Sequence, residues 1–149
     1  MTRIRRILHP SDFSSASNTA FNKAVELTRT NRAELLLAHM MTTPVVAMAG
    51  DGYVSPHVYA QIESSARTEA QKQLGRLIAK AKKGGIRAKV LLLRGVPHEQ
   101  ITRAARSKRA DLVVLGTHGR TGLARFFLGS VAGRVVASAT VPVMTVRGK

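Results

Sequence analysis

The sequence predicts an α/β fold: one domain with an open five-stranded parallel sheet and helices on both faces. Three observations predict it. Short apolar runs alternate with helical patterns along the chain, some of these runs are continuously apolar, and 149 residues suit a single core. The apolar fraction of 44% is normal for a globular protein. Cysteine is absent, which excludes disulfide scaffolds, thiolate zinc sites and cysteine nucleophiles.

The five expected strands are short apolar runs, namely Ile4 to His9, Ala33 to Met40, Ala88 to Leu93, Asp111 to Gly116 and Val141 to Val146. Three of them contain unbroken apolar stretches, at residues 35–38, 90–93 and 112–115. Such stretches are typical of parallel strands that are covered on both faces. The last strand contains Pro142, which has no backbone N–H to donate, so we expect it at an edge of the sheet.

Helical patterns fill the intervals between the strands. The serines among residues 14–17 can cap a first helix, whose apolar stripe runs from Ala20 to Leu27. A longer stripe runs from Val58 to Ala81 and stops at Gly84-Gly85, where a left-handed cap is most easily formed.

Two further helices are marked by their first residues. Pro97 is suited to the first turn of a third helix, followed by Glu99, and Gly129-Ser130 begins a fourth. Only the segment from Met41 to Pro56 does not follow this alternation, because it contains several prolines and glycines. We interpret it as a long loop, and loops of that length are often lids over a binding site.

Ligands of open parallel sheets bind at the carboxyl ends of the strands, so the loops that follow strands are the candidate sites. One such loop runs from His9 to Ser14. The other begins with Gly116 and Gly119, whose backbone can approach an anion because they lack a Cβ atom. The helix that starts at Gly129-Ser130 offers free N–H groups to the same anion. The alternative is an ordinary turn followed by a capping serine.

The spacing Gly116-x2-Gly119-x9-Gly129-Ser130 resembles the nucleotide signature of the ATP-binding branch of the universal stress proteins. Further segments are similar to this family, namely Ile7 to Ser14, Leu37 to Met40, Gly95 to Glu99 and Val141 to Val143. The resemblance covers almost the whole chain and is weakest over residues 41–56. It implies a Rossmann-like, adenine nucleotide alpha-hydrolase-like fold with strand order 3-2-1-4-5.

The resemblance also implies roles for the matched residues. Asp12, with Pro10 and Ser11, would line the adenosine side and accept hydrogen bonds from the ribose hydroxyls. Met40 would offer backbone groups to the adenine edge. The phosphates of ATP, ADP or AMP would be surrounded by Gly116, His118, Gly119, Gly129, Ser130 and Val131. Phosphate oxygens and water would supply most of the ligands of Mg²⁺, which prefers oxygen ligands.

Two of these assignments have structural alternatives. Asp12 could instead cap the following helix, although Ser14 is also available as a cap. The phosphate loop is more basic than the motif requires, with Arg120, Arg125 and Arg134 nearby, and these side chains either strengthen phosphate binding or are only solvated.

The sequence supports a regulatory nucleotide-binding protein of the stress response better than an enzyme. It has no Gly-x4-Gly-Lys-Ser/Thr loop and no Gly-x-Ser-x-Gly elbow, and its five histidines show no metal-binding spacing. His118 is the one candidate base, so we expect at most slow ATP hydrolysis. The resemblance implies a homodimer through the edge strand at Val141 to Val146.

The net charge of +16 raises the question of a polyanionic partner. The basic residues are dispersed along helices and loops, and aromatic residues, at 4%, are too few for base stacking. We therefore interpret them as a solvated surface and keep a polyanion- or nucleic-acid-binding protein, without nucleotide-dependent function, as the alternative. The basic N-terminus lacks the apolar core of a signal peptide and no stretch is long enough to span a membrane, so we expect a cytoplasmic protein.

Overall fold

A computed structural model describes residues 3–41, 54–118 and 128–148 of the chain. The described residues form one five-stranded parallel sheet in the order β3-β2-β1-β4-β5. Its strands are β1 (Arg6–Pro10), β2 (Glu34–Met41), β3 (Arg87–Arg94), β4 (Leu112–Gly116) and β5 (Val143–Val146). Both the predicted fold class and the predicted strand order are confirmed, and β5 lies at an edge as expected from Pro142.

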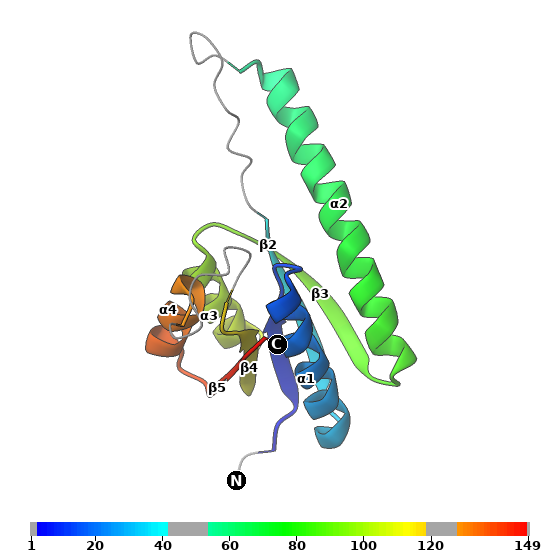
Figure 1. The fold of residues 1–149 in the computed structure, drawn as a ribbon, viewed down its shortest axis with the longest axis vertical. Coiled ribbons are helices and arrows are strands. Elements are labelled where there is room, and N and C mark those ends of the chain that lie inside the picture. The colour runs from blue at the N-terminus through cyan, green and yellow to red at the C-terminus, as the bar shows by residue number, and fades with distance from the viewer. Residues whose placement is uncertain (1–2, 42–53, 119–127, 149) are drawn as a thin grey trace.

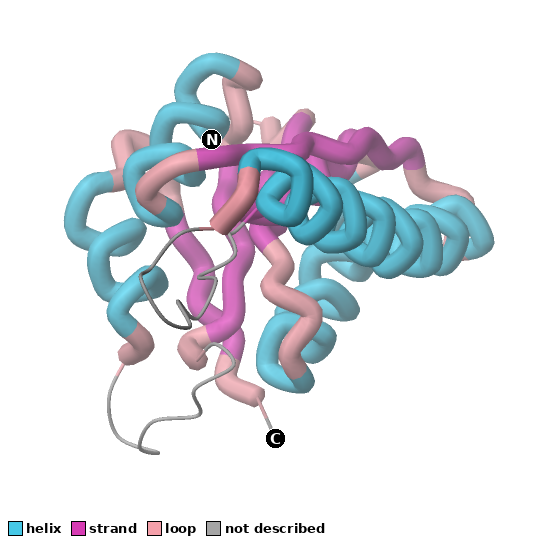
Figure 2. The backbone as a smooth tube through the Cα atoms, turned by 90° about the horizontal axis from the view of Figure 1, so that it is seen from above, coloured by secondary structure: helices cyan, strands magenta, loops and turns pink. Residues whose placement is uncertain are grey.

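Helices cover both faces of the sheet. On one face, α1 (Ser15–Asn31) and α2 (Pro56–Lys83) pack on Ile7, Leu35 and Leu37. On the other face, α3 (Pro97–Ser107) and α4 (Ser130–Ser138) pack on strand residues of opposite orientation such as Leu8 and Val113. Because side chains alternate along each strand, these two sets form separate cores above and below the sheet. Figures 1 and 2 show the strands between the two helical layers.

The local signals mark the helix ends correctly. The hydroxyl of Ser14 accepts a hydrogen bond from the N–H of Ser17 at 3.1 Å and caps α1. Pro56 and Pro97 stand in the first turns of α2 and α3, where a missing N–H does no harm. The left-handed residue after α2 is Gly85, with a φ of 79°. This conformation lets the chain turn back into β3.

The sheet covers less of α2 and β3 than their apolar patterns predicted. Helix α2 has 28 residues, about 42 Å, whereas β3 has 8 residues, about 26 Å. The first half of the helix therefore extends past the sheet (Figure 1), and Val58 is 42% exposed. Strand β3 is an edge strand in which Val90 is 42% exposed, so the expectation that residues 90–93 are covered on both faces is wrong.

Several boundaries differ from the expected ones. Strand β1 begins at Arg6 and not at Ile4, and β5 begins at Val143, directly after the proline. Of the expected loop between residues 41 and 56, Met41 belongs to β2 and Pro56 to α2, while residues 42–53 lie outside the described part. No helix within the described residues is long and apolar enough to cross a membrane.

Candidate functional site

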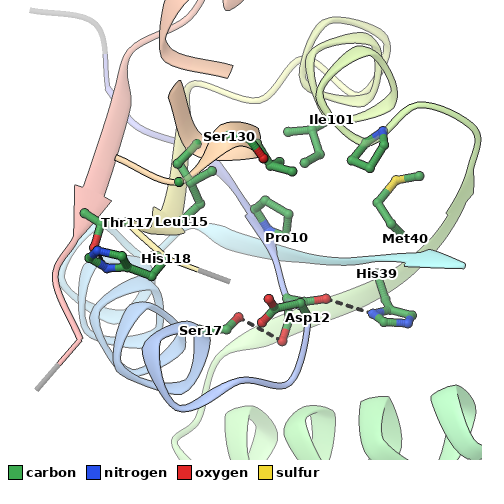
Figure 3. A pocket seen from close by; sticks show the side chains of 16 residues that line it. Pro10, Asp12, Ser17, His39, Met40, Ile101, Leu115, Thr117, His118 and Ser130 are labelled. Carbon is green, nitrogen blue, oxygen red and sulfur yellow. Dashed lines mark hydrogen bonds between the residues drawn. The ribbon is translucent and has the colours of Figure 1, made fainter. Parts of the chain in front are cut away.

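A cavity of about 470 Å³ opens at the carboxyl ends of β1, β2 and β4 (Figure 3). It lies where the strand order reverses, since β1 pairs with β2 on one side and with β4 on the other. Its lining comes from the strand ends and from the first turns of three helices, namely Pro10, Ser11, Asp12, Ser17, His39, Met40, Pro97, Ile101, Leu115, Gly116, Thr117, His118, Gly129, Ser130, Val131 and Ala132.

Hydrogen bonds hold the loop after β1 in place. The N–H of Ser11 donates to the carbonyl of Ala38 at 2.8 Å, and its buried hydroxyl lies 3.1 Å from that of Ser17. The carboxylate of Asp12 accepts a bond from the N–H of Ser14 at 2.9 Å. Since Ser14 itself caps α1, the alternative role of Asp12 as the helix cap is not the one the structure shows. Asp12 instead tightens the turn and lines the cavity.

His39, at the end of β2, braces the same loop. Its Nδ1 donates to the carbonyl of Ser11 at 2.8 Å, and its ring stacks on that of Phe13 with centroids 4.4 Å apart. Phe13 has a φ of 65°, a conformation that is unusual for an aromatic residue. These contacts flank Asp12 on both sides, so they set where its side chain lies.

Glycines bring the loop after β4 against its neighbours. A Cβ atom on Gly116 would lie 3.2 Å from the backbone of Ala16, and one on Gly129 would lie 2.9 Å from the carbonyl oxygen of Thr117. The N–H of Gly129 donates to this same oxygen at 2.6 Å. The end of β4 and the start of α4 are therefore in direct contact, as an anion site built from both requires.

The start of α4 lies at the cavity and has no side-chain cap. Because Gly129 uses its own N–H in the bond to Thr117, the expectation that this group is available to an anion is wrong. The first bond within the helix runs from Gly133 to the carbonyl of Gly129. The N–H groups of Ser130, Val131 and Ala132 therefore form the positive end of the helix, and these residues line the cavity.

The opposite wall of the cavity is apolar. Met40 comes from β2, Leu115 from β4, and Pro97 and Ile101 from the first turns of α3. Figure 3 shows Met40 and Ile101 on the side of Pro10 that lies away from His118. The cavity thus combines an apolar part, a carboxylate and a helix N-terminus.

His118 is held by its neighbour. Its Nδ1 shares a hydrogen bond of 2.7 Å with the hydroxyl of Thr117. No group of three or more His, Cys, Asp or Glu that could hold a metal ion occurs among the described residues. Among the residues that the structure describes, Asp12 is the one acidic residue that lines the cavity.

The structure brings together all the predicted site residues that it describes, which are Pro10, Ser11, Asp12, Met40, Gly116, His118, Gly129, Ser130 and Val131. Gly119, Arg120 and Arg125 lie outside the described part of the chain. Arg134 stands on the exposed side of α4 and does not line the cavity.

Sequence reasoning missed part of the lining, above all Ser17, His39, Ile101, Thr117 and Ala132. Ile101 packs in the core beneath α3 and is 2% exposed, but its position beside the cavity depends on how α3 docks. His39 stands directly before Met40 and carried a detectable signal, because polar residues at strand ends are site candidates.

A comparison with protein families matches residues 3–147 to the model described as the universal stress protein family. The protein belongs to the universal stress protein family. Universal stress protein MJ0531 of Methanocaldococcus jannaschii is 33% identical to it, over 96% of this chain and 82% of that protein. Universal stress protein YxiE of Bacillus subtilis is 32% identical, over 95% and 98% of the two chains.

Solved structures of this family share the fold. Protein MJ0577 has a TM-score of 0.85 at 24% sequence identity, covering 99% of each chain. Universal stress protein UspA from Lactobacillus plantarum has a TM-score of 0.83 at 24% identity, covering 99% of this chain and all of the other. The family that the motifs predicted is thus confirmed by the match over residues 3–147, and these structures confirm the fold.

Proposed function

We propose that this universal stress protein binds an adenine nucleotide, with ATP as the principal ligand, and that occupancy of the cavity regulates its function in the stress response. One observation carries the proposal. A single cavity has the carboxylate of Asp12 near the end of β1 and the uncapped N-terminus of α4 beyond the end of β4. The carboxylate can accept hydrogen bonds from a ribose, and the helix N-terminus can donate hydrogen bonds to phosphates.

The apolar wall suits the base. Met40, Pro97 and Ile101 offer a surface on which a flat ring can pack, and the backbone of Met40 at the end of β2 can bond to the adenine edge. Volumes of small-molecule sites run from roughly 300 to 1,000 Å³, and this cavity, at about 470 Å³, falls within that range.

The polar end suits the phosphates. The N–H groups of Ser130, Val131 and Ala132, together with the helix dipole, favour negative charge, and the hydroxyl of Ser130 adds a donor. Gly116 keeps the end of β4 close to α1, since a Cβ atom there would lie 3.2 Å from the backbone of Ala16. Gly119 and Arg120, outside the described residues, complete this end in the proposal.

Relatives of known structure support the ligand class. A universal stress protein has been solved in complex with cAMP, an Arabidopsis thaliana family member with AMP bound, and one from Archaeoglobus fulgidus in complex with dAMP. All three have the same fold, with TM-scores from 0.65 to 0.69.

The residues present fit Mg²⁺ only as an ion that arrives with the nucleotide. Of the described part of the chain, Asp12 alone supplies a carboxylate to the cavity, and Mg²⁺ is commonly held by phosphates and water with one or two protein oxygens. When bound, the ion neutralises phosphate charge. The protein's own residues orient the nucleotide.

The second part of the proposal is a homodimer through β5. This strand is an edge of the sheet, and Met144 on it is 37% exposed. An unpaired edge is a template for another strand, and a second copy of the same edge satisfies its backbone groups symmetrically.

Mass spectrometry of ligand released from freshly purified protein tests the nucleotide proposal. We expect adenine nucleotide in the native protein and in a Glu69→Ala control, in which an exposed acid of α2 is removed. Asp12→Ala and Gly119→Ala are expected to lose it. The proposal fails if no nucleotide is released and titration calorimetry detects no ATP binding, or if Asp12→Ala retains full affinity.

A further inference from the structure

Basic side chains gather at the end of the sheet where the strands begin, opposite to the cavity. In a parallel βα fold all strands begin, and all helices end, at one end of the sheet, which is distinct from its lateral edges at β3 and β5. Residues 3–6, 29–34, 80–89 and 106–111, here called the basic edge, occupy these junctions. They contain 13 of the 24 Lys and Arg but two of the eight Asp and Glu. The basic residues are dispersed along the sequence, but the expectation that they are also dispersed over the folded protein is wrong.

Contacts between the junctions show that they form one surface. Arg6, at the start of β1, donates through Nη1 to the carbonyl of Lys108 after α3, at 3.0 Å. Its Nε lies 3.6 Å from Glu34 at the start of β2, and the same carboxylate lies 3.2 Å from Nζ of Lys89 on β3. Four junctions of the fold thus share neighbours at this edge.

The end of α2 joins this surface through α1. Nε of Arg29, in the last turn of α1, donates to the carbonyl of Gly84 at 3.2 Å. Lys80, Lys82 and Lys83 are all exposed in the last turn of α2 beside this contact. Figure 1 shows the turn after α2 and the start of β1 at the same end of the molecule.

The acidic residues neutralise little of this charge. Glu34 is shared by two of the bases, and Asp111 accepts bonds from the backbone N–H groups of Arg5 and Arg6, at 2.7 and 2.9 Å. Thirteen bases and two acids leave a net charge of +11 on this edge. The other side chains of the chain contribute +5 to the total of +16.

Helix stabilisation explains part of this enrichment, since cations are favourable at helix C-termini. Three helices end at this edge, and each contributes about half a negative charge. That sum is far smaller than the excess of positive charge. Arg3, Arg5 and Arg87 also stand before or at the start of strands, where no helix end needs them.

The composition of the edge indicates what kind of anion it fits. None of its four segments contains an aromatic residue, so it has no platform for unpaired bases. Its large apolar side chains point inward: Ile86 is 8% exposed and Ile4 is half-buried. It therefore lacks the apolar groups that insert into a lipid bilayer. Exposed point charges without stacking or insertion suit the regular phosphates of a duplex.

We propose that the basic edge binds the phosphate backbone of double-stranded nucleic acid, without base sequence preference. The cavity lies at the opposite end of the sheet, at the carboxyl ends of the strands, so the duplex and a nucleotide occupy separate sites. This proposal does not depend on the proposed nucleotide function.

Fluorescence anisotropy of a short labelled DNA duplex, measured over a series of salt concentrations, tests the proposal. Lys82→Gln with Lys83→Gln removes two charges from the basic edge. The matched control, Arg67→Gln with Lys72→Gln, removes two exposed charges about 15 Å or more away along α2. We expect the edge variant to bind about tenfold more weakly at low salt, with a salt slope smaller by up to about 2, and the control to bind as the native protein does.

Four results would overturn the proposal. The first is no duplex binding at low salt. The second is an equal loss of affinity in the two variants, which would mean that only net charge matters. The third is tighter binding to phosphatidylserine vesicles than to the duplex at the same salt concentration. Saturating ATP at constant ionic strength is expected to leave duplex affinity unchanged, and the fourth result, competition by ATP, would place the duplex in the cavity instead.

Discussion

The Nδ1 of His39 donates a hydrogen bond of 2.8 Å to the carbonyl oxygen of Ser11, which ties the end of β2 to the loop that carries Asp12. The ring of His39 also stacks on Phe13, on the far side of Asp12. The position of the carboxylate in the cavity thus depends on a residue that need not touch the ligand through its side chain.

Replacement of His39 tests this relationship. We expect His39→Ala to weaken ATP binding by about tenfold, because the loop loses one hydrogen bond of about 1 kcal/mol and its stacking partner. His39→Phe keeps the stacking without the donor and should show a smaller loss. Titration calorimetry well below the melting temperature separates affinity from stability. Native affinity in His39→Ala would contradict a positioning role.

Gly129, the N-cap of α4, and Gly133, in the first turn of that helix, allow a matched comparison. A Cβ on Gly129 would meet the carbonyl oxygen of Thr117 at 2.9 Å, whereas one on Gly133 would meet Leu128 at an ordinary 3.9 Å. We expect Gly129→Ala to move the start of α4 and weaken ATP binding by about tenfold or more, the loss of roughly one charge-assisted hydrogen bond. Gly133→Ala should keep the affinity and stabilise the protein by up to about 1 kcal/mol. Equal affinities in the two variants would contradict the tight contact.

His9 makes the stability of the fold sensitive to acid. Its ring is fully buried and tilted against Phe21, its Nδ1 donates to the carbonyl of Val114 at 2.8 Å, and its Nε2 has no hydrogen-bond partner. Burial lowers the pKa of His9 from 6.5 to about 4, against smaller raising effects of the Val114 carbonyl and the Asp12 charge. The neutral ring is therefore the folded form.

Since the folded pKa is depressed, the unfolded chain binds the proton first as the pH falls. The contribution of His9 is fully present above about pH 6.5 and is lost progressively toward pH 4, a total of roughly 3 kcal/mol. Melting temperatures between pH 7 and 4.5 should fall less steeply in His9→Asn, whose amide can still donate to Val114. His57→Asn, at an exposed position on α2, should follow the native curve. A native-like slope in His9→Asn would contradict this assignment.

The geometry of β5 allows a clean test of the proposed dimer. The carbonyls of Pro142 and Val146 accept bonds from Val113 of β4 and from Thr117 directly after β4. The backbone groups of the alternate residues, Val143 and Thr145, therefore face away from the sheet. Thr145→Pro removes an outward N–H and should give a folded monomer by light scattering at micromolar concentration. The native protein should be a dimer under the same conditions. A native monomer, or a dimeric Thr145→Pro variant, would exclude β5 as the interface.

Hydrolysis of bound ATP is expected to be slow, because His118, the candidate base beside the proposed phosphate end of the cavity, already shares its Nδ1 in a hydrogen bond with Thr117. Phosphate release by the native protein should stay close to the rate without protein. His118→Ala should leave that rate unchanged. Steady turnover that disappears in His118→Ala would instead make this protein an ATPase.

Much of the fold could be predicted because its signals are local. The unbroken apolar stretches of β2 and β4 predicted central strands, and Pro142 predicted an edge, since each reflects the surroundings of a single strand. The same argument failed for residues 90–93 of β3. That strand lies at the edge of the sheet, where its cover depends on how α2 and α3 dock, and the periodicity of one element does not record how far another extends.

The site was predicted where one motif carries it. The glycine spacing located the end of β4 and the start of α4, and the first loop placed Asp12. Ala132, Ile101 and His39 escaped because their roles come from contacts between elements distant in sequence. The use of the Gly129 N–H by Thr117 escaped for the same reason.

The sequence by itself determined which segments become strands and helices and where a nucleotide-type motif lies, because propensity, capping and apolar periodicity act over a few residues. Only the tertiary structure decided that His39 braces the Asp12 loop, that His9 is buried with an unpaired nitrogen, and that basic residues spread along the chain converge on one edge. Those outcomes depend on how parallel βα units dock, because docking places all strand starts at one end of the sheet and all strand ends at the other.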